Sequence, residues 1–420
     1  MLSTNCFQEY IGILTDIQEN ILIYLDADVN IEENYQNLCN KFEQVKIREI
    51  KHELRLLLHL LVNISNNHHR CHDFFKKIER ILQFFKNDIT KHYTNNEIFN
   101  IFKSNKRILL YLFEENIITV NELIIHKLLY GKYSMAKYPL YFTPEIKKFI
   151  KEHKKSTFHS KMGLLKKLPD DFNQKRKTGE SDFYICTLIQ QDLVKEFIEY
   201  VNRTNFPLSA AIKLSIYETN SFLIKKMIES TNHQRNKDAE VTLIKYAAFY
   251  GSIQIFQYLL INNVELTPSL WLYAIHGENP DIIHLLEENN VQPIVSHIDT
   301  LRSVHFTIVT RDEKTYEECF KESIKCHHND ISNYIISNYF NYDNSFSKYG
   351  IKYHNYAFIK ETYINSYCLY ELCKYDYAIL VNILMQNDGI DVNRVGILLL
   401  FNHVYFYFYQ VQFYNVLCNF

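Results

Sequence analysis

Apolar residues recur every three or four positions along the first part of the chain, which is the period of an amphipathic α-helix. In the segment 47–65 five of them fall on one helical face: Ile50, Leu54, Leu57, Leu58 and Leu61. The segment 71–85 repeats this pattern with aromatic and aliphatic residues. We therefore predict an N-terminal helical region over 1–153.

A helical hairpin is predicted for 242–267, TLIKYAAFYGSIQIFQYLLINNVELT, where two apolar runs flank one glycine. Ile244, Ala247 and Ala248 share one face of the first helix, and the two small alanines let a neighbouring helix approach closely. Gly251 stands where a left-handed residue would end that helix.

The same hairpin pattern recurs from residue 181 onward. Further copies stand at 269–291, 318–340, 369–393, 181–201 and, less well matched, 209–230. In the repeat register, the copy at 269–291 is offset by a short distance from the 242–267 copy. The copies at 318–340 and 369–393 follow at longer, equal offsets. These imperfect copies of one helix–turn–helix unit, about six in all, predict a stack of hairpins over 181–393.

These hairpins resemble ankyrin repeats, most closely in AAFYGSIQIFQYLL, in NNVELT at 262–267 and in IDVN at 390–393. Together with the N-terminal helices, the chain is similar to divergent ankyrin-repeat proteins of trichomonad protists over roughly 8–393. It departs from that pattern in its irregular repeat spacing, in lacking a complete Thr-Pro-Leu-His start, and in a segment at 296–310 that looks inserted. The resemblance implies an all-α, ankyrin-like helical-hairpin solenoid that acts as a non-enzymatic interaction scaffold.

In such a scaffold, recognition would use exposed positions on the first helices, the turns that follow them and the loop tips. The repeat register gives these candidates: Lys245, Phe249, Tyr250, His276, Glu278, Lys325 and His327, with Glu265 and Thr267 at a loop tip. Ordinary solvated surface would show the same residues, so their role in protein binding is an expectation from register alone.

The densest group of metal-ligating residue types is NNHHRCH, which contains His68, His69, Cys71 and His72. Zinc sites generally combine two pairs of ligands at defined spacing, and no second pair lies nearby in the sequence. We interpret the group as a polar connection between helices, with metal binding as the alternative. A second group, Cys326-His327-His328, falls on a turn between repeat helices, where we expect a structural role.

Trp271 is the only tryptophan and raises the question of a binding hot spot. In the repeat register it aligns with Ile244, a core position of the first helix. We therefore predict that Trp271 fills the core, with surface recognition as the alternative.

Signatures of catalysis are absent from the sequence. The chain has 9 glycines and contains no phosphate-binding GxxxxGK[ST], GxGxxG, HExxH or GxSxG motif. We predict no enzyme activity, no catalytic or metal-binding residues and no cofactor.

Composition limits the partners and the compartment. The formal net charge of −2 gives no overall attraction to nucleic acid, so we predict no nucleic-acid partner. The scaffold interpretation implies an unidentified protein partner, and we predict a monomeric chain. Nine single cysteines without a CxxC pair fit reduced thiols in the cytoplasm, with the nucleus as alternative.

The basic segment 154–180 is interpreted as a solvated linker, with a targeting or phosphate-binding patch as the alternative.

The chain ends in an uncharged aromatic tail over 394–420, which is free of charge from Val395 onward. Its length suits a membrane span, but Asn402, His403 and further Asn and Gln residues oppose burial in lipid. We weigh three interpretations: an aromatic segment packed on the last repeat, a membrane anchor, and non-native sequence. A membrane-tethered adaptor is therefore the alternative to the scaffold.

Overall fold

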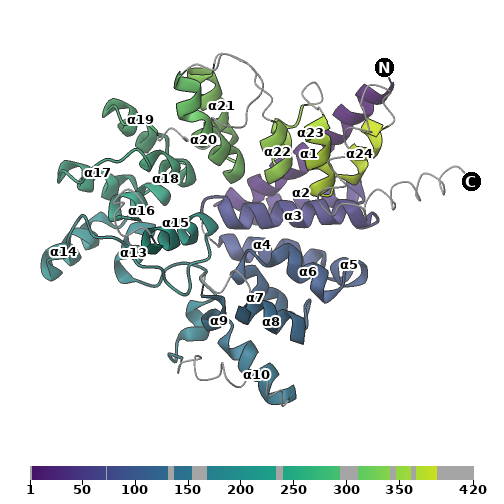
Figure 1. The fold of residues 1–420 in the computed structure, drawn as a ribbon, viewed down its shortest axis with the longest axis horizontal. Helices are drawn as coiled ribbons and strands as arrows, with labels where there is room; N and C mark the ends of the chain where they lie inside the picture. The colour runs from purple at the N-terminus through teal and green to yellow at the C-terminus, as the bar shows by residue number, and fades with distance from the viewer. Residues whose placement is uncertain are drawn as a thin grey trace, which may run out of the picture. The chain divides into compact units, whose positions relative to one another are not determined.

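The structure, a computed structural model, describes residues 2–71, 73–130, 137–153, 168–232, 240–293, 311–340, 347–360 and 366–385. These residues form helices and their connections, without a strand among them, which confirms the predicted all-α class (Figure 1). No helix of this described part is long and apolar enough to cross a membrane. The tail at 394–420, the segment at 296–310 and the motif at 390–393 lie outside the described residues.

The chain divides into two compact units: Met1–Asn63 together with Asn341–Phe420, and Ile64–Phe340. These units differ from the ranges expected from sequence, because the beginning of the chain groups with the last hairpin. The helices of the first unit are α1 (Leu2–Asp26), α2 (Ile31–Val45), most of α3 (Lys51–Asn67), α22 (Ser347–Tyr353), η5 (Tyr356–Phe358), α23 (Ser366–Lys374) and α24 (Ala378–Met385). Helix α1 packs against α2, η5 and α24.

A buried amide joins distant parts of the chain in the first unit. The Gln18 side chain donates to Asn355 Oδ1 at 2.9 Å and accepts from the Tyr356 backbone N–H at 2.7 Å. Gln18 and Asn355 stand 337 positions apart in the sequence, so no local periodicity reveals their contact.

The second unit begins with short helices that follow α3. They are α4 (Phe74–Phe84), α5 (Lys86–His92), α6 (Asn95–Phe102), α7 (Lys106–Glu114), α8 (Glu122–Tyr130), α9 (Tyr138–Tyr141), α10 (Thr143–His153) and α12 (Phe172–Lys175). Thr94 and Glu97 form a capping box at the start of α6. The apolar face predicted for 71–85 is buried in α4, with Ile78, Ile81 and Leu82 fully covered.

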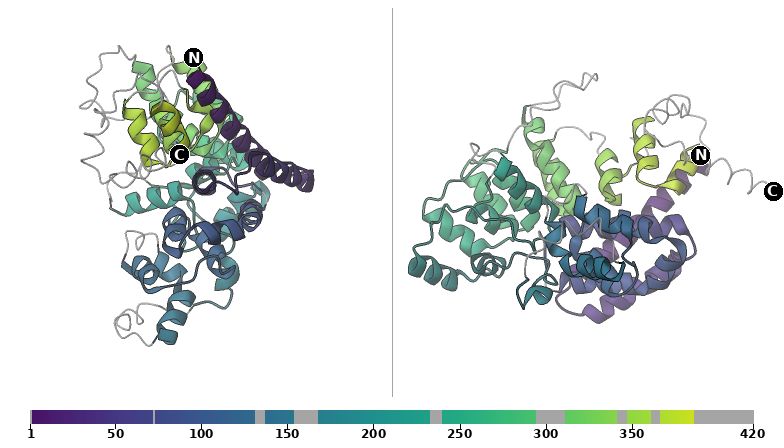
Figure 2. Two further views of the ribbon diagram at one scale, coloured as in Figure 1. Left: turned by 90° about the vertical axis from the view of Figure 1, so that its right-hand side faces the viewer. Right: turned by 60° about the horizontal axis from the view of Figure 1, so that its bottom comes forward.

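Four helical hairpins follow in the described part of the second unit. They are α13 (Tyr184–Gln190) with α14 (Val194–Thr204), α16 (Leu243–Phe249) with α17 (Ile253–Ile261), α18 (Leu270–Gly277) with α19 (Pro280–Glu288), and α20 (Arg311–Cys326) with α21 (Asn329–Tyr339). Among the first helices, α13 packs on α16, α16 on α18 and α18 on α20. Among the second helices, α14 packs on α17 and α17 on α19 (Figures 1 and 2).

Each hairpin turn contains one residue with left-handed backbone conformation. These residues are Asp192, Gly251, Glu278 and His327 in the second unit and Asp376 between α23 and α24 in the first. From Gly251 onward they stand at equivalent positions of the repeat register that the sequence predicts. The left-handed residue lets the chain leave one helix and cap its last carbonyls before the next helix starts.

The copy at 209–230 lacks its first helix. The segment 209–220 is not helical, and Ala211 instead forms an antiparallel bridge with Thr242. Only α15 (Ser221–Asn232) remains of the expected hairpin. The expectation of a hairpin at this position is therefore wrong.

Helices α16 and α18 approach each other closely at two glycines. Gly251 has φ +66°, which a side chain disfavours, and a Cβ added there would lie 2.6 Å from the carbonyl oxygen of Gly277. A Cβ on Gly277 would collide with the Ala248 carbonyl oxygen and lie 2.7 Å from the Gly251 nitrogen. The close approach predicted from Ala247 and Ala248 thus extends to the end of α18.

Trp271 is buried, as predicted for a core position. Its side chain is 1% exposed, and its Nε1–H donates to the Val291 carbonyl at 2.6 Å. The indole therefore ties the start of α18 to the loop that follows α19.

The basic segment is partly incorporated into the second unit. Its beginning, 154–167, lies outside the described part, but Arg176 is 4% exposed and donates to Glu145 Oε2 at 2.8 Å. The Arg176 backbone carbonyl accepts from the Tyr141 hydroxyl at 2.6 Å. The interpretation as a solvated linker is wrong at Arg176, because its ion pair with Glu145 of α10 allows the guanidinium to be buried.

Lys106, the first residue of α7, is a buried lysine that we expect to make the stability of the fold depend on pH. It is 1% exposed, and its Nζ donates to the Ile216 carbonyl at 2.7 Å. Burial lowers the Lys106 pKa to about 7, although the carboxylate of Glu218 opposes this shift. The folded chain therefore releases this proton at lower pH than the unfolded chain, in which a lysine has a pKa of about 10.4.

We expect the free energy of unfolding to rise between about pH 7 and pH 9 by about 1–3 kcal/mol more in the wild type than in Lys106→Met. The unfolded state holds more protons than the folded state in this window, so raising the pH favours folding. Urea unfolding of both proteins at the two pH values measures the difference. An identical pH dependence for the two proteins would contradict it.

Candidate functional site

The C-terminal end of α3 is buried in the second unit, where side chains from several parts of the chain contact it. The last carbonyl groups of a helix have no partner inside the helix and need donors from elsewhere. Here Asn105 Nδ2 donates to the Ser65 carbonyl, Asn220 Nδ2 to the Asn66 carbonyl and His276 Nδ1 to the Asn67 carbonyl, each at 3.1 Å. Side chains from three separate parts of the chain therefore cap this helix end.

Asn105 and Asn220 each bind two helix ends at once. The Asn105 Oδ1 accepts from the backbone of Arg107 and Ile108 at the start of α7. In the same way Asn220 Oδ1 accepts from the backbone N–H groups of Phe222 and Leu223 in the first turn of α15. Because both asparagines are at most 1% exposed, these bonds place the end of α3 firmly against the neighbouring helices.

Two buried histidines face each other just beyond this helix end. His68 follows α3 and is 2% exposed, whereas His328 precedes α21 as its N-cap residue and is 1% exposed. His68 Nδ1 lies 2.8 Å from the Cys326 carbonyl, and His328 Nδ1 lies 2.7 Å from the Ile275 carbonyl. A carbonyl only accepts, so each Nδ1 carries the proton, and in the neutral rings Nε2 carries the lone pair.

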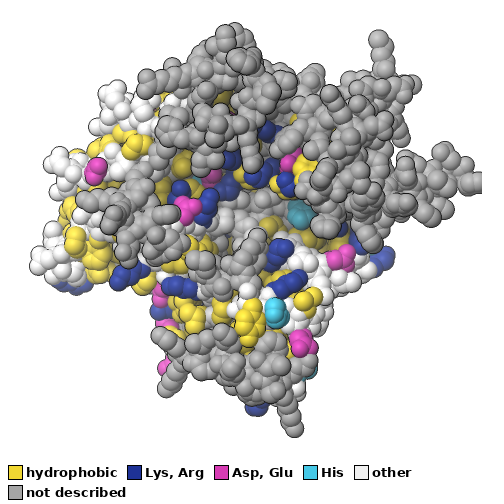
Figure 3. Space-filling view, in the orientation of Figure 1, with side chains coloured by type: hydrophobic (Ala, Val, Ile, Leu, Met, Phe, Trp, Pro, Cys, Tyr) yellow, Lys and Arg dark blue, Asp and Glu magenta, His cyan; other side chains and the backbone are white. Residues whose placement is uncertain are grey.

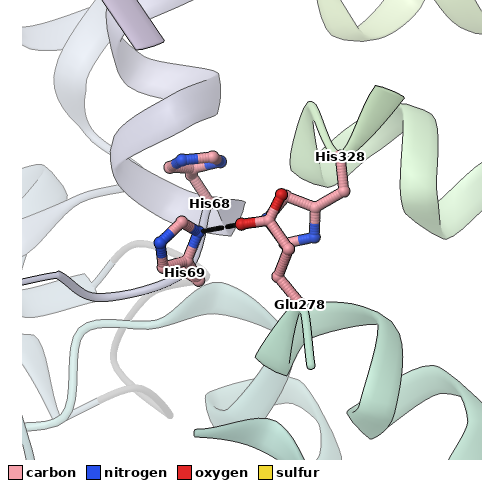
Figure 4. Close-up of side chains that lie close together, drawn as sticks. All are labelled: His68, His69, Glu278 and His328. Atoms are coloured by element: carbon pink, nitrogen blue, oxygen red, sulfur yellow. Dashed lines mark hydrogen bonds and ion pairs between the residues drawn. The ribbon is translucent and has the colours of Figure 1, made fainter. Parts of the chain in front are cut away.

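His69 and Glu278 complete the group that we call the histidine cluster: His68, His69, Glu278 and His328. His69 Nδ1 lies 2.6 Å from Glu278 Oε2, and Figure 4 shows the carboxylate next to the His69 and His328 rings. The Nε2 atom of His328 is 3.4 Å from His69 Nδ1 and 3.6 Å from Glu278 Oε2. His68 is adjacent, with its ring centroid 4.4 Å from that of His69 and 5.0 Å from that of His328.

The histidine cluster has the ligand types and spacing to hold a metal ion. One ligand atom from each of its four residues lies within 4.8 Å of all the others. Burial, followed by the neighbouring His68 and His69, lowers the pKa of His328 well below its usual value. Burial therefore favours the neutral form of the His328 ring, which is the form that binds a metal.

A second group, His276, Glu322 and Cys326, lies beside this cluster. His276 Nε2 is 2.8 Å from Glu322 Oε1, and Cys326 Sγ is 3.4 Å from His276 Nδ1. Glu322 also accepts from Lys325 Nζ at 2.7 Å. Burial alone would raise the Glu322 pKa, but Lys325 and His276 outweigh it and hold this pKa well below its usual value.

The order thiol, imidazole, carboxylate is the one used to activate a cysteine nucleophile. In this chain, however, the Cys326 side chain is 0% exposed, and burial raises its pKa well above its usual value. The thiol is therefore protonated and covered. The group instead serves as a polar contact that fixes α18 against α20 and the end of α3.

Four of the candidate interaction residues are buried, so the expectation that they are exposed is wrong for them: Lys245, Phe249, His276 and His327. For Lys245, Phe249 and His276 the reason is that α16 packs between α13 and α18, and α18 packs between α16 and α20. Both sides of these first helices are therefore covered. Lys245, for example, is 1% exposed and donates to the Glu240 carbonyl at 3.1 Å.

The other candidates lie nearer to solvent. Glu265 is exposed, whereas Tyr250, Thr267, Glu278 and Lys325 are half-buried. The structure brings Glu278 and His276 close to the end of α3 and leaves Glu265 and Thr267 in the loop between α17 and α18. Their part in protein binding remains a prediction.

The sequence group NNHHRCH supplies only two of the four residues of the histidine cluster. His68 and His69 belong to the histidine cluster, Cys71 does not, and His72 lies outside the described residues. The second pair, Glu278 and His328, comes from a distant part of the chain, with His328 standing 259 positions after His69. The signal that could have found this pair is the repeat register, because both residues lie in the equivalent turns of two successive hairpins.

No protein-family model, curated protein or solved structure matches this chain.

Proposed function

We propose that the segment 181–340 forms a short ankyrin-like solenoid that acts as a protein-interaction scaffold. The supporting observation is the order of helix contacts, in which each hairpin from α13 to α21 packs on the next complete hairpin along the chain. In repeat proteins this order gives an elongated array that presents loop tips and one face to a partner.

The most exposed large apolar side chain among the described residues lies at the loop tip that follows α17. Ile261 ends α17 and is 78% exposed, and exposed Glu265 follows in the same loop. At the start of α13, Tyr184 is 54% exposed. In Figure 3 hydrophobic side chains show along the margin where Figure 1 places α14 and α17. Such a mixture of apolar and charged groups is typical of transient protein interfaces.

We expect a loop-tip variant, Ile261→Ser with Glu265→Ala and Thr267→Ala, to weaken partner capture about tenfold or more without unfolding the chain. These side chains lie at the end of α17 and in the loop that follows, and they support little of the core. Quantitative mass spectrometry of proteins retained by the full-length chain measures the loss, and circular dichroism checks the fold.

A matched control removes exposed apolar surface elsewhere. Ile23→Ser with Val29→Ser changes side chains that are 58% and 73% exposed in the first unit. We expect this control to retain the partners of the wild type. Equal retention by the loop-tip variant would show that this loop is not the binding surface.

A further inference from the structure

We infer that His68, His69, Glu278 and His328 bind one divalent transition-metal ion of the zinc class. The four residues come from three places in the second unit: the end of α3, the turn between α18 and α19, and the turn between α20 and α21. The site would join these segments at the point where the hairpin stack meets the end of α3.

The hydrogen bonds of the two buried histidines favour metal binding by the cluster. In metal sites, a ligating histidine almost always donates its second ring N–H to a carbonyl or carboxylate, which fixes the tautomer. His68 and His328 have this arrangement, since their Nδ1 atoms lie 2.8 and 2.7 Å from backbone carbonyl oxygens outside the cluster. In both rings the lone pair that a metal would use is then on Nε2.

Two of the distances between ligand atoms are close to those of a tetrahedral site. Bonds of about 2.0–2.1 Å to zinc place tetrahedral ligands about 3.3 Å from one another. The distances of 3.4 Å from His69 Nδ1 to His328 Nε2 and 3.6 Å from Glu278 Oε2 to His328 Nε2 are near this value. The 2.6 Å contact between His69 and Glu278 is a hydrogen bond, and its two atoms would move apart slightly to surround an ion.

The surroundings also suit a cation. The site lies at the C-terminal end of α3, where the helix dipole is negative, and Glu278 adds a carboxylate. His68 and His328 are buried, but the side chains of His69 and Glu278 are 24% and 35% exposed. An ion can therefore enter from solvent on the side of His69 and Glu278 and be held by the two buried rings.

The donor set selects the metal. Three imidazoles and one carboxylate suit zinc and related transition metals, whereas calcium and magnesium prefer oxygen ligands. The neighbouring group of His276, Glu322 and Cys326 is a poorer candidate because Lys325 Nζ lies 2.7 Å from Glu322 Oε1 and would repel a cation. We therefore place the ion in the histidine cluster.

Zinc titration of the chelator-treated full-length chain, followed by calorimetry, tests the site. We expect one high-affinity zinc ion per chain, and a loss of affinity of about 100-fold or more in His69→Gln and in Glu278→Gln, since outer-shell changes alone typically cost about 10- to 100-fold. These two residues are half-buried, so their substitution leaves the core intact. Zinc should also raise the melting temperature of the wild type, and by clearly less that of the two variants at the same zinc concentration.

His284→Gln is the matched control, because His284 is exposed on α19 and its Nδ1 pairs with Glu287, outside the histidine cluster. It should bind zinc like the wild type, and so should Cys326→Ser. Unchanged affinity in both His69→Gln and Glu278→Gln would overturn the inference. Loss of binding in Cys326→Ser alone would place the ion in the neighbouring group and would overturn it as well.

Discussion

Gly277→Ala is expected to destabilise the second unit by about 3 kcal/mol or more, because no side chain fits between α18 and α16. The added Cβ would collide with the Ala248 carbonyl oxygen and lie 2.7 Å from the backbone nitrogen and 3.0 Å from the Cα of Gly251. All three atoms belong to the backbone, so no side-chain rotation relieves the contact. The two helices would have to separate, which exposes the core between the hairpins.

Urea unfolding with circular dichroism measures this effect, and Gly12→Ala is the matched control. Gly12 is exposed in α1, and a Cβ added there meets nothing within 4 Å. Alanine has a higher helix propensity than glycine, so the free energy of unfolding of this control should rise by up to about 1 kcal/mol. If Gly277→Ala unfolds at the same urea concentration as the wild type, the close packing of α16 and α18 is incorrect.

Trp271→Ala is expected to cost about 3–5 kcal/mol of folding free energy. The indole is 1% exposed, packs edge-on against Tyr316 with ring centroids 5.3 Å apart, and donates to the Val291 carbonyl. Its removal leaves a large cavity at the start of α18 and deprives the Val291 carbonyl of this donor. The unfolding midpoint in urea gives the size of the effect.

Tyr184→Ala provides the comparison for an exposed aromatic residue. Tyr184 is 54% exposed at the start of α13. Its removal should change stability by about 0.5 kcal/mol or less. Similar losses for Trp271→Ala and Tyr184→Ala would mean that Trp271 lies at the surface, which is the alternative that the burial excludes.

Local sequence pattern predicts much of the second unit. The apolar periodicity gives the helices, and the repeat register gives the turn positions at Gly251, Glu278 and His327. These features depend on residues that are close in the sequence, so a short segment is enough to predict each of them. The same reasoning fails at 209–220, where a bridge to Thr242 takes the place of the expected helix.

Contacts between distant segments are not predictable in this way. Gln18 with Asn355, and His68 with His328, are brought together only by the path of the whole chain. The burial of Lys245 and His276 could not be predicted from the sequence for a related reason. A repeat register tells which residues are equivalent, but exposure also depends on how closely the next hairpin and the end of α3 approach.

The histidine cluster brings together three segments that are far apart in the sequence, and a bound metal ion would hold them in place. X-ray absorption spectroscopy of the zinc-loaded chain tests this central claim most directly, because it reads the ligands of the ion itself. We expect nitrogen and oxygen ligands at about 2.0–2.1 Å, with the scattering pattern of several imidazole rings and without sulfur. A sulfur shell at about 2.3 Å, or the spectrum of the hydrated ion, would contradict this claim.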